Sequence, residues 1–284
     1  MTVAEAILQS AQLLRQAGVT EPRREAGSLL AHVMSKDRTF IISHAEDLLS
    51  DQELSTFNAY VLRRAKGEPL QYITGYQDFF GLEFKVTPEV LIPRPETELL
   101  VETALELIGN ADAARFVCDV GTGSGCIAIT ILHERPFVQA VALDISEVAI
   151  RIAELNALRH SVNNRISFAV SDCFQSLVEA PRFDLIVSNP PYVPAEALAG
   201  LQREVKDHEP RLALTPGMDG LSVIRRLILQ APVFLKPKGY LLVEIGFDQG
   251  EAVRHLVDPK VWDLPSIQAD LQGIPRILVL QRTG

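Results

Sequence analysis

Apolar residues in the first 75 positions recur at the three- and four-residue spacing of amphipathic helices. The pattern predicts four helices and no strand. Thr2 with Glu5, and Ser50 with Glu53, form capping boxes at the starts of the first and the fourth helix. Thr20 is expected to cap the second helix, ahead of a proline in its first turn. This part of the chain is therefore predicted to be a small all-α domain.

After this domain the sequence becomes rich in aromatic residues, turn-forming residues and prolines. Phe79, Phe80, Phe84 and neighbouring apolar residues, interrupted by Gly81, predict a β-hairpin that links two domains. Prolines then force an extended entry into a helix that begins at Pro95. The predicted domains are 1–75, a helical domain that positions the substrate; 76–94, the hairpin linker; and 95–284, the catalytic domain.

From residue 95 onward, strand-like apolar runs alternate with helical segments. This alternation is typical of an α/β fold with an open, mainly parallel sheet covered on both faces. The last two strands lack a helical segment between them, so they are expected to form an antiparallel hairpin at one edge. Helices are expected in the other gaps. The seven predicted strands cover residues 116–120, 139–144, 166–170, 183–188, 240–245, 261–268 and 275–281.

Composition narrows the class of protein. The 284 residues are 47% hydrophobic and 22% charged, as in ordinary globular proteins. No apolar run approaches the roughly 18 residues of a membrane span, and the start lacks a signal-peptide pattern, so a cytoplasmic protein is expected. A net charge of −9 disfavours broad attachment to nucleic acid. The three cysteines have no zinc-type spacing, so neither a metal nor a disulfide is expected.

A glycine-rich turn, "GTGSG", follows the first strand of the predicted sheet and precedes a helix. Such a turn lets the backbone bend sharply, approach a ligand closely and direct the amides of the helix toward it. Alone it is a weak signal, because many such turns serve only packing. The predicted cofactor loop consists of Gly121, Thr122, Gly123, Ser124 and Gly125.

Acidic residues after the next two strands strengthen that signal. Asp144 stands 23 positions after Gly121, where a carboxylate can accept hydrogen bonds from both hydroxyls of a ribose. Asp172 follows the third strand, where an adenine amine could be bound. The turn has the pattern GxGxG and lacks the third glycine of the dinucleotide-binding pattern GxGxxG. Its lack of lysine and arginine also suits a cofactor without phosphates. Both features favour S-adenosylmethionine over a dinucleotide. Asp119 could orient the cofactor's amino group. The alternatives are that Asp144 caps the following helix and that Asp172 is a turn residue.

The fourth strand ends in "SNPPY", and its prolines cannot continue a sheet ladder. Asn189 therefore stands at the carboxyl edge of the sheet, where ligands collect. Its amide oxygen and the carbonyl of Pro190 can accept the two hydrogens of a planar nitrogen and draw it toward a tetrahedral shape. Pro190 and Pro191 stiffen the backbone, and Tyr192 offers a flat face for stacking. Positioning would then do most of the chemistry, without a general base.

Together, "GTGSG", "LDIS" and "SNPPY" resemble the class I S-adenosylmethionine-dependent methyltransferases that act on nitrogen. "LIPRPETE", "HEPRLAL" and "GMDGL" are further similar to the bacterial release factor glutamine methyltransferases. The resemblance implies a Rossmann-like sheet and methylation of the glutamine in the Gly-Gly-Gln loop of peptide chain release factors, with S-adenosylhomocysteine as product. It assigns cofactor contacts to the glycine loop, Asp144, Asp172, Cys173 and Asn189, and glutamine binding to Asn189, Pro190, Pro191 and Tyr192.

Several points stay open at this stage. Many family members have a bulkier residue in place of Cys173, so the adenine could instead pack on Phe174 or another apolar neighbour. Arg94 with Glu96 and Glu98 could close over the cofactor, brace the domains or simply cap a helix. The rival functions are an adenine-amine methyltransferase acting on DNA or RNA and a non-catalytic cofactor-binding protein. A monomer that binds neither membrane nor nucleic acid directly is expected.

Overall fold

The structure, a computed structural model, describes residues 1–109, 114–180, 182–263 and 265–284. These residues form two compact units. One contains residues 1–76 and 202–208, and the other contains residues 77–201 and 209–284. The short segment 202–208 thus packs with the helical unit, although it lies within the sequence of the other unit.

The four predicted helices of the helical unit are present, with both capping boxes formed, and a short fifth helix at Leu70–Thr74 was not predicted. The prediction that Thr20 caps the second helix is wrong. That helix begins at Pro22, so the cap position falls on Glu21, whose side chain pairs with Arg24 instead of capping. The helices of this unit are α1 (Val3–Gln16), α2 (Pro22–Met34), α3 (Arg38–Ser43), α4 (Asp51–Ala65), α5 (Leu70–Thr74) and α9 (Arg203–His208).

An ion-pair cluster ties α9 to this unit. Arg64 of α4 is only 3% exposed and pairs with Glu25 of α2 and with Glu204 of α9, the latter at 2.5 Å. A buried guanidinium must be paired, because the cost of removing it from water is otherwise uncompensated. This cluster therefore attaches a segment 140 residues further along the chain to the helical core.

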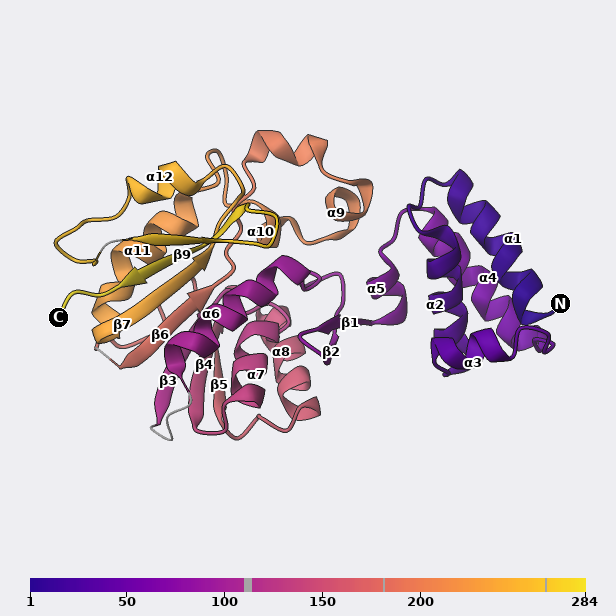
Figure 1. The fold of residues 1–284 in the computed structure, drawn as a ribbon, viewed down its shortest axis with the longest axis horizontal. Coiled ribbons are helices and arrows are strands. Elements are labelled where there is room, and N and C mark those ends of the chain that lie inside the picture. The colour runs from indigo at the N-terminus through magenta and orange to yellow at the C-terminus, as the bar shows by residue number, and fades with distance from the viewer. Residues whose placement is uncertain (110–113, 181, 264) are drawn as a thin grey trace. The chain divides into compact units, whose positions relative to one another are not determined.

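The second unit contains a seven-stranded sheet in the order β5-β4-β3-β6-β7-β9-β8 (Figure 1). Its first five strands are parallel, and β9 pairs antiparallel with both β7 and β8. The predicted mainly parallel α/β sheet with an antiparallel edge hairpin is confirmed. The strands are β3 (Arg115–Val120), β4 (Val138–Asp144), β5 (Ile166–Val170), β6 (Phe183–Ser188), β7 (Leu235–Glu244), β8 (Ser266–Ala269) and β9 (Pro275–Gln281).

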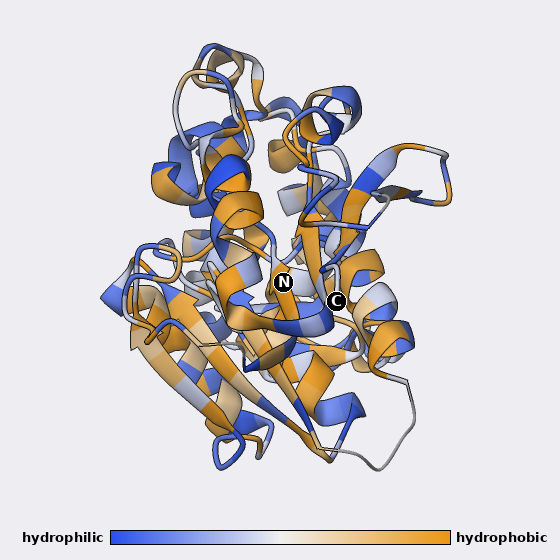
Figure 2. Cartoon of the chain, turned by 90° about the vertical axis from the view of Figure 1, so that its left-hand side faces the viewer, coloured by the Kyte–Doolittle hydropathy of each residue, from blue (hydrophilic) through white to orange (hydrophobic). Residues whose placement is uncertain are grey.

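Helices cover both faces of this sheet, and a separate hairpin, β1 (Tyr76–Phe79) with β2 (Leu82–Lys85), precedes it. Successive strand residues point to opposite faces. Leu185 and Val187 of β6 pack with α6 and α7, whereas Ile186 packs with α11. The strands are accordingly hydrophobic along most of their length (Figure 2). The helices are η1 (Pro95–Thr97), α6 (Glu98–Ile108), α7 (Cys126–Glu134), α8 (Glu147–Arg159), η2 (Ala195–Gly200), α10 (Arg211–Leu214), α11 (Ser222–Phe234) and α12 (Gly250–Arg254).

Some predicted boundaries differ from the observed ones. β7 begins at Leu235 rather than at residue 240, because an irregularity in its pairing with β6 accommodates Pro237 and Gly239. The strand predicted at 261–268 begins at Ser266, and Leu264 lies outside the described residues. The described residues between β5 and β6 form turns, not the expected helix. Within the part of the chain that the structure describes, no helix is long and apolar enough to cross a membrane.

Replacing the buried arginine tests the cluster in the helical unit. Arg64→Met should leave the carboxylates of Glu25 and Glu204 without their cation and lower the free energy of unfolding by about 2 kcal/mol, a buried-pair cost reduced for their partial exposure. Arg63→Met is the control, because Arg63 is 43% exposed, and its loss should cost under about 1 kcal/mol. Hydrogen exchange of the α2 and α4 amides measures both. Equal losses of protection in the two variants would contradict the account.

Candidate functional site

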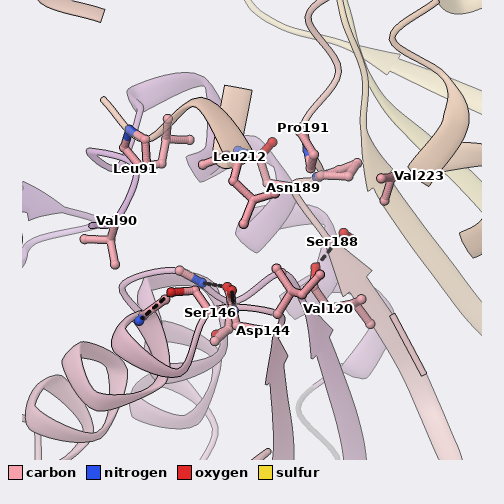
Figure 3. A pocket seen from close by; sticks show the side chains of 18 of the residues that line it. Val90, Leu91, Val120, Asp144, Ser146, Ser188, Asn189, Pro191, Leu212 and Val223 are labelled. Atoms are coloured by element: carbon pink, nitrogen blue, oxygen red, sulfur yellow. Dashed lines mark hydrogen bonds between the residues drawn. The ribbon is translucent and has the colours of Figure 1, made fainter. Parts of the chain in front are cut away.

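The chain reverses its direction across the sheet between β3 and β6, which are neighbours in the sheet but not in sequence. Ligands of open α/β sheets bind at such a switch point, beyond the carboxyl ends of the strands. A cavity of about 650 Å³ lies there. Asp144 and Ser146 line one side of it, and Asn189, Pro191 and Leu212 line the other (Figure 3). The structure thus brings the glycine loop, the acidic strand ends and the Asn-Pro-Pro segment together.

The glycine loop continues directly from β3. The N–H groups of Gly121 and Thr122 both donate to the carbonyl of Leu143, at 2.8 and 2.9 Å. Four of the five predicted loop residues line the cavity. The fifth, Gly125, forms the start of α7 with a φ of +84°, and an added Cβ would lie 2.6 Å from Ile129 Cδ1. Gly125 therefore serves the turn and the packing of the helix.

Asp119 forms hydrogen bonds with the glycine loop and with the helix that follows it. Its Oδ2 accepts hydrogen bonds from the Thr122 hydroxyl at 2.7 Å and from the Ala128 N–H at 3.3 Å. Burial raises the pKa of Asp119 to about 7, while the bonds from Thr122 and Ala128 oppose that rise. Its Oδ1 has no hydrogen-bond partner among the described residues, and Asp119 is not among the residues that line the cavity.

Asp144 lies at the end of β4 and borders the cavity. Its carboxylate accepts from the Gly123 N–H at 2.8 Å and from the Ser146 N–H at 2.9 Å. Burial raises the pKa of Asp144, opposed by these backbone donors. The cap of α8 is Ser146, whose hydroxyl accepts from the Ala149 N–H at 3.3 Å. The alternative that Asp144 is itself the helix cap is therefore wrong.

Asp172 and Cys173 follow β5 and line the same cavity. Asp172 pairs with Arg226 of α11 at 2.8 Å. Cys173 is buried and adopts a left-handed backbone conformation with a φ of +51°. Phe174, by contrast, is absent from the lining and stacks on Phe234 in the core, with ring centroids 4.8 Å apart. The lining of the cavity also includes the apolar side chains of Ile145, Val148 and Val223.

Arg94 does not pair with Glu96 or Glu98 as the sequence suggested. It pairs with Glu209, whose carboxylate also accepts from the Ile92 N–H at 3.4 Å. Glu98 instead accepts from the N–H of Phe80 in the β-hairpin at 2.8 Å. The motifs "LIPRPETE" and "HEPRLAL" are thus joined by an ion pair at the border of the cavity.

Asn189 and the two prolines after β6 line the cavity. The Asn189 side chain donates from Nδ2 to Thr97 Oγ1 at 3.0 Å, and its Oδ1 accepts no hydrogen bond from the described residues. Its backbone carbonyl lies 4.0 Å from the position of a Cβ added to Gly121, so the segment adjoins the glycine loop. Tyr192 is not in the lining, and its hydroxyl donates to Glu244 at 3.2 Å.

The backbone of Tyr192 is braced by Gln249, which the sequence did not single out, and by a glycine of the motif "GMDGL". Gln249 donates from Nε2 to the Tyr192 carbonyl at 3.0 Å. Gly220 of "GMDGL" packs so closely that a Cβ added there would lie 2.3 Å from the same carbonyl oxygen. The motif glycine therefore permits a close approach. The sequence analysis assigned no role to Thr97, although it lies within "LIPRPETE", and it did not single out Glu244 or Gln249, since single polar residues at element ends carry no spacing signal.

This fold and site define an S-adenosylmethionine-dependent methyltransferase of the Rossmann-like class. Residues 5–75 match the family described as PrmC N-terminal domain, and residues 95–207 match the methyltransferase small domain. A release factor glutamine methyltransferase of Nitratidesulfovibrio vulgaris is 43% identical over 95% of this chain and 92% of its own length. One of Coxiella burnetii is 40% identical over 99% of both chains. The chain belongs to the release factor glutamine methyltransferase family.

Solved structures with lower identity share the fold. The hMettl16 catalytic domain, solved with an RNA hairpin, is 17% identical with a TM-score of 0.60, covering 89% of this chain and 92% of that one. The Thermus thermophilus 16S rRNA methyltransferase RsmC, solved with AdoMet and guanosine, is 18% identical with a TM-score of 0.54, covering 73% and 49%. These likenesses support the Rossmann-like methyltransferase architecture.

Gly220→Ala tests the close approach to Tyr192. The added methyl group would meet the Tyr192 carbonyl in a position of positive φ, so the variant should lose about 2 kcal/mol of stability beyond the backbone strain itself. Gly81→Ala is the matched control, because Gly81 has a similar φ of +74° and nothing within 4 Å of an added Cβ. Urea unfolding of both variants measures the difference. Equal destabilisation would show that the contact with Tyr192 is unimportant.

Proposed function

We propose that this protein transfers a methyl group from S-adenosylmethionine to the side-chain nitrogen of the glutamine in the Gly-Gly-Gln loop of peptide chain release factors. The observation that carries the proposal is the placement of Asn189 beside the glycine loop, with its Nδ2 held by Thr97 and its Oδ1 accepting no hydrogen bond from the described residues. The 40–43% identity to release factor glutamine methyltransferases over nearly the whole chain supports the same substrate.

The residues that line the cavity fit S-adenosylmethionine. Its volume of about 650 Å³ is in the range of small-molecule sites. The Asp144 carboxylate would accept hydrogen bonds from the ribose hydroxyls, and Asp172, Cys173 and Val148 would surround the adenine. Both arginines of the described lining, Arg94 and Arg226, are already paired with carboxylates. This neutralised lining favours a cofactor without phosphates.

The chain's own residues would act on the glutamine mainly by holding it. Asn189 Oδ1 and the Pro190 carbonyl would accept the two amide hydrogens, which weakens the conjugation of the nitrogen lone pair with its carbonyl. Pro190 and Pro191 keep these acceptors in place. When bound, S-adenosylmethionine supplies an electrophilic methyl group on a sulfonium. The methylated nitrogen then loses its extra proton readily, so a dedicated general base is not required.

Tyr192 would contribute differently from the stacking role that its position in the motif suggests. Its hydroxyl is bound to Glu244, and its backbone is held by Gln249 and Gly220. We therefore assign it to fixing the Asn-Pro-Pro backbone at the border of the cavity. The helical unit would position the release factor. We expect a cytoplasmic monomer that acts on protein and not directly on nucleic acid.

Transfer of labelled methyl groups tests the function. Purified protein incubated with labelled S-adenosylmethionine should label a bacterial release factor and should not label a release factor whose Gly-Gly-Gln glutamine is replaced by alanine. Label on duplex DNA or RNA instead would identify an adenine-amine methyltransferase. No label on any of them would identify a non-catalytic cofactor-binding protein.

Asn189→Ala should separate binding from chemistry. It removes an acceptor that is used most strongly as the nitrogen becomes tetrahedral, so kcat should fall by at least about 1000-fold while cofactor affinity changes little. Single-turnover kinetics and calorimetry measure the two quantities. A kcat near the wild-type value would remove Asn189 from the mechanism.

Asp144→Ala should mainly affect cofactor affinity. It should weaken cofactor binding by about 1.5 to 3 kcal/mol, the contribution of charge-assisted hydrogen bonds to the ribose. Calorimetric titration with S-adenosylhomocysteine measures the loss. Ser146→Ala is the control for the helix start, because it removes the α8 cap and keeps the carboxylate. Wild-type affinity in Asp144→Ala, or an equal loss in Ser146→Ala, would exclude the ribose contact.

A further inference from the structure

Arg226 of α11 binds Asp172, which follows β5, and both residues line the cavity. Arg226 Nη1 donates to Asp172 Oδ1 at 2.8 Å, and Nη2 makes a longer bond of 3.5 Å to the Asp172 backbone carbonyl. One guanidinium thus binds the side chain and the backbone of a residue 54 positions away in sequence. Val223, three residues earlier on the same face of α11, also lines the cavity (Figure 3). This face of α11 is therefore turned toward the cavity.

The turn after β5 does not need this ion pair for its shape. It uses the backbone of Asp172, whose carbonyl accepts from the Gln175 N–H at 3.3 Å, and not the carboxylate. The N–H of Ser171 donates to the Asp144 carbonyl at 2.8 Å, which joins the turn to β4. The side chains of Asp172 and Arg226 are 38% and 34% exposed, and an ion pair at such exposure contributes little to stability. A role in the cavity accounts better for the pair.

The pair leaves one carboxylate oxygen for a ligand. Oδ1 of Asp172 is bound to Arg226, whereas its Oδ2 accepts no hydrogen bond from the described residues. Asp144, the proposed ribose ligand, is in register with Val170 of β5, so Asp172 stands two residues further along the neighbouring strand. This spacing suits a nucleoside whose ribose is bound at Asp144 and whose base lies beside Asp172. A carboxylate only accepts hydrogen bonds, and the exocyclic amine of adenine donates them.

We propose that Arg226 is a positioning residue that makes the cofactor site specific for adenine. By binding Oδ1 of Asp172, it directs Oδ2 toward the exocyclic amine of the base. A base with a carbonyl oxygen in that position, such as hypoxanthine, brings an acceptor against an acceptor and is disfavoured. This inference rests on the proposed function, because it takes S-adenosylmethionine as the ligand of the cavity.

Two ligands that differ in this group of the base test the proposal. S-adenosylhomocysteine carries the amine, and S-inosylhomocysteine carries a carbonyl oxygen in its place. In calorimetric titrations of the wild-type protein, the Kd of the adenosyl ligand should be at least about 10-fold below that of the inosyl ligand, because only the amine donates to Asp172. Asp172→Ala should remove most of that preference.

Replacing the arginine tests its own part. Arg226→Met should raise the Kd of the adenosyl ligand by about 3- to 10-fold and change that of the inosyl ligand by less than about twofold, because the carboxylate that reads the amine loses its fixed direction. In the Asp172→Ala background the same change should cause no further loss, because Arg226 acts through Asp172. Arg225→Met is the matched control: Arg225 is the preceding residue of α11, is 42% exposed, pairs with Asp219 and does not line the cavity. It should keep both wild-type Kd values.

The ratio of the two Kd values distinguishes positioning from a general structural role. A loosened helix or turn would weaken both ligands together and lower the melting temperature, with the ratio unchanged. An unchanged ratio in Arg226→Met would overturn the proposal, as would a further loss of adenosyl affinity when Arg226→Met is added to Asp172→Ala. Equal binding of the two ligands by the wild-type protein would also overturn it.

These titrations do not depend on methyl transfer. If the wild-type protein shows the expected preference but labels no release factor, the proposed function fails and the role of Arg226 stands. If the wild-type protein binds neither ligand, the S-adenosylmethionine site and the role of Arg226 are both overturned.

Discussion

The hydrogen bond from Asn189 to Thr97 is the interaction on which the site depends. It leaves one polar atom of the asparagine, Oδ1, directed away from its protein partner at the carboxyl edge of a parallel sheet. Several surrounding elements fix the position of Asn189 and its Oδ1. β6 delivers it beside the glycine loop, two prolines stiffen the segment, and Gln249 with Gly220 holds the backbone that follows.

The sheet explains why these elements converge. Five parallel strands place every carboxyl end on one edge, and the switch point between β3 and β6 opens the cavity there. Alternating apolar residues bury both faces of the sheet, which makes the edge rigid. The polar residues that line the cavity therefore project from fixed positions. A site that acts mainly by holding its substrate requires such rigidity.

The sequence was sufficient for the features that depend on local pattern. Strand-like apolar runs that alternate with helical segments predicted the sheet, the spacing of amphipathic helices predicted the helical unit, and the capping boxes marked two helix starts. The glycine turn, Asp144 and Asn189 could be found because each directly follows an apolar run. The sequence pattern could not predict which residues pair across long separations in the chain. Arg94 is separated from Glu209 by 115 residues, and only folding brings them together.

The same limit explains the other differences. Thr97 and Glu244 look like an ordinary helix cap and a strand-end carboxylate, and their hydrogen bonds to Asn189 and Tyr192 are visible only in three dimensions. Phe174 follows the cavity residue Cys173, but a left-handed turn at Cys173 sends it into the core. The Gly220 contact with Tyr192 likewise joins two motifs that sequence analysis treated separately.

A crystal structure of the protein with S-adenosylhomocysteine and a peptide containing Gly-Gly-Gln would test the central claim most directly. The account predicts that the glutamine nitrogen lies about 3 Å from both Asn189 Oδ1 and the Pro190 carbonyl oxygen, with Asn189 Nδ2 still bound to Thr97. A glutamine held elsewhere, or by Nδ2 of Asn189 with the Thr97 bond broken, would contradict it.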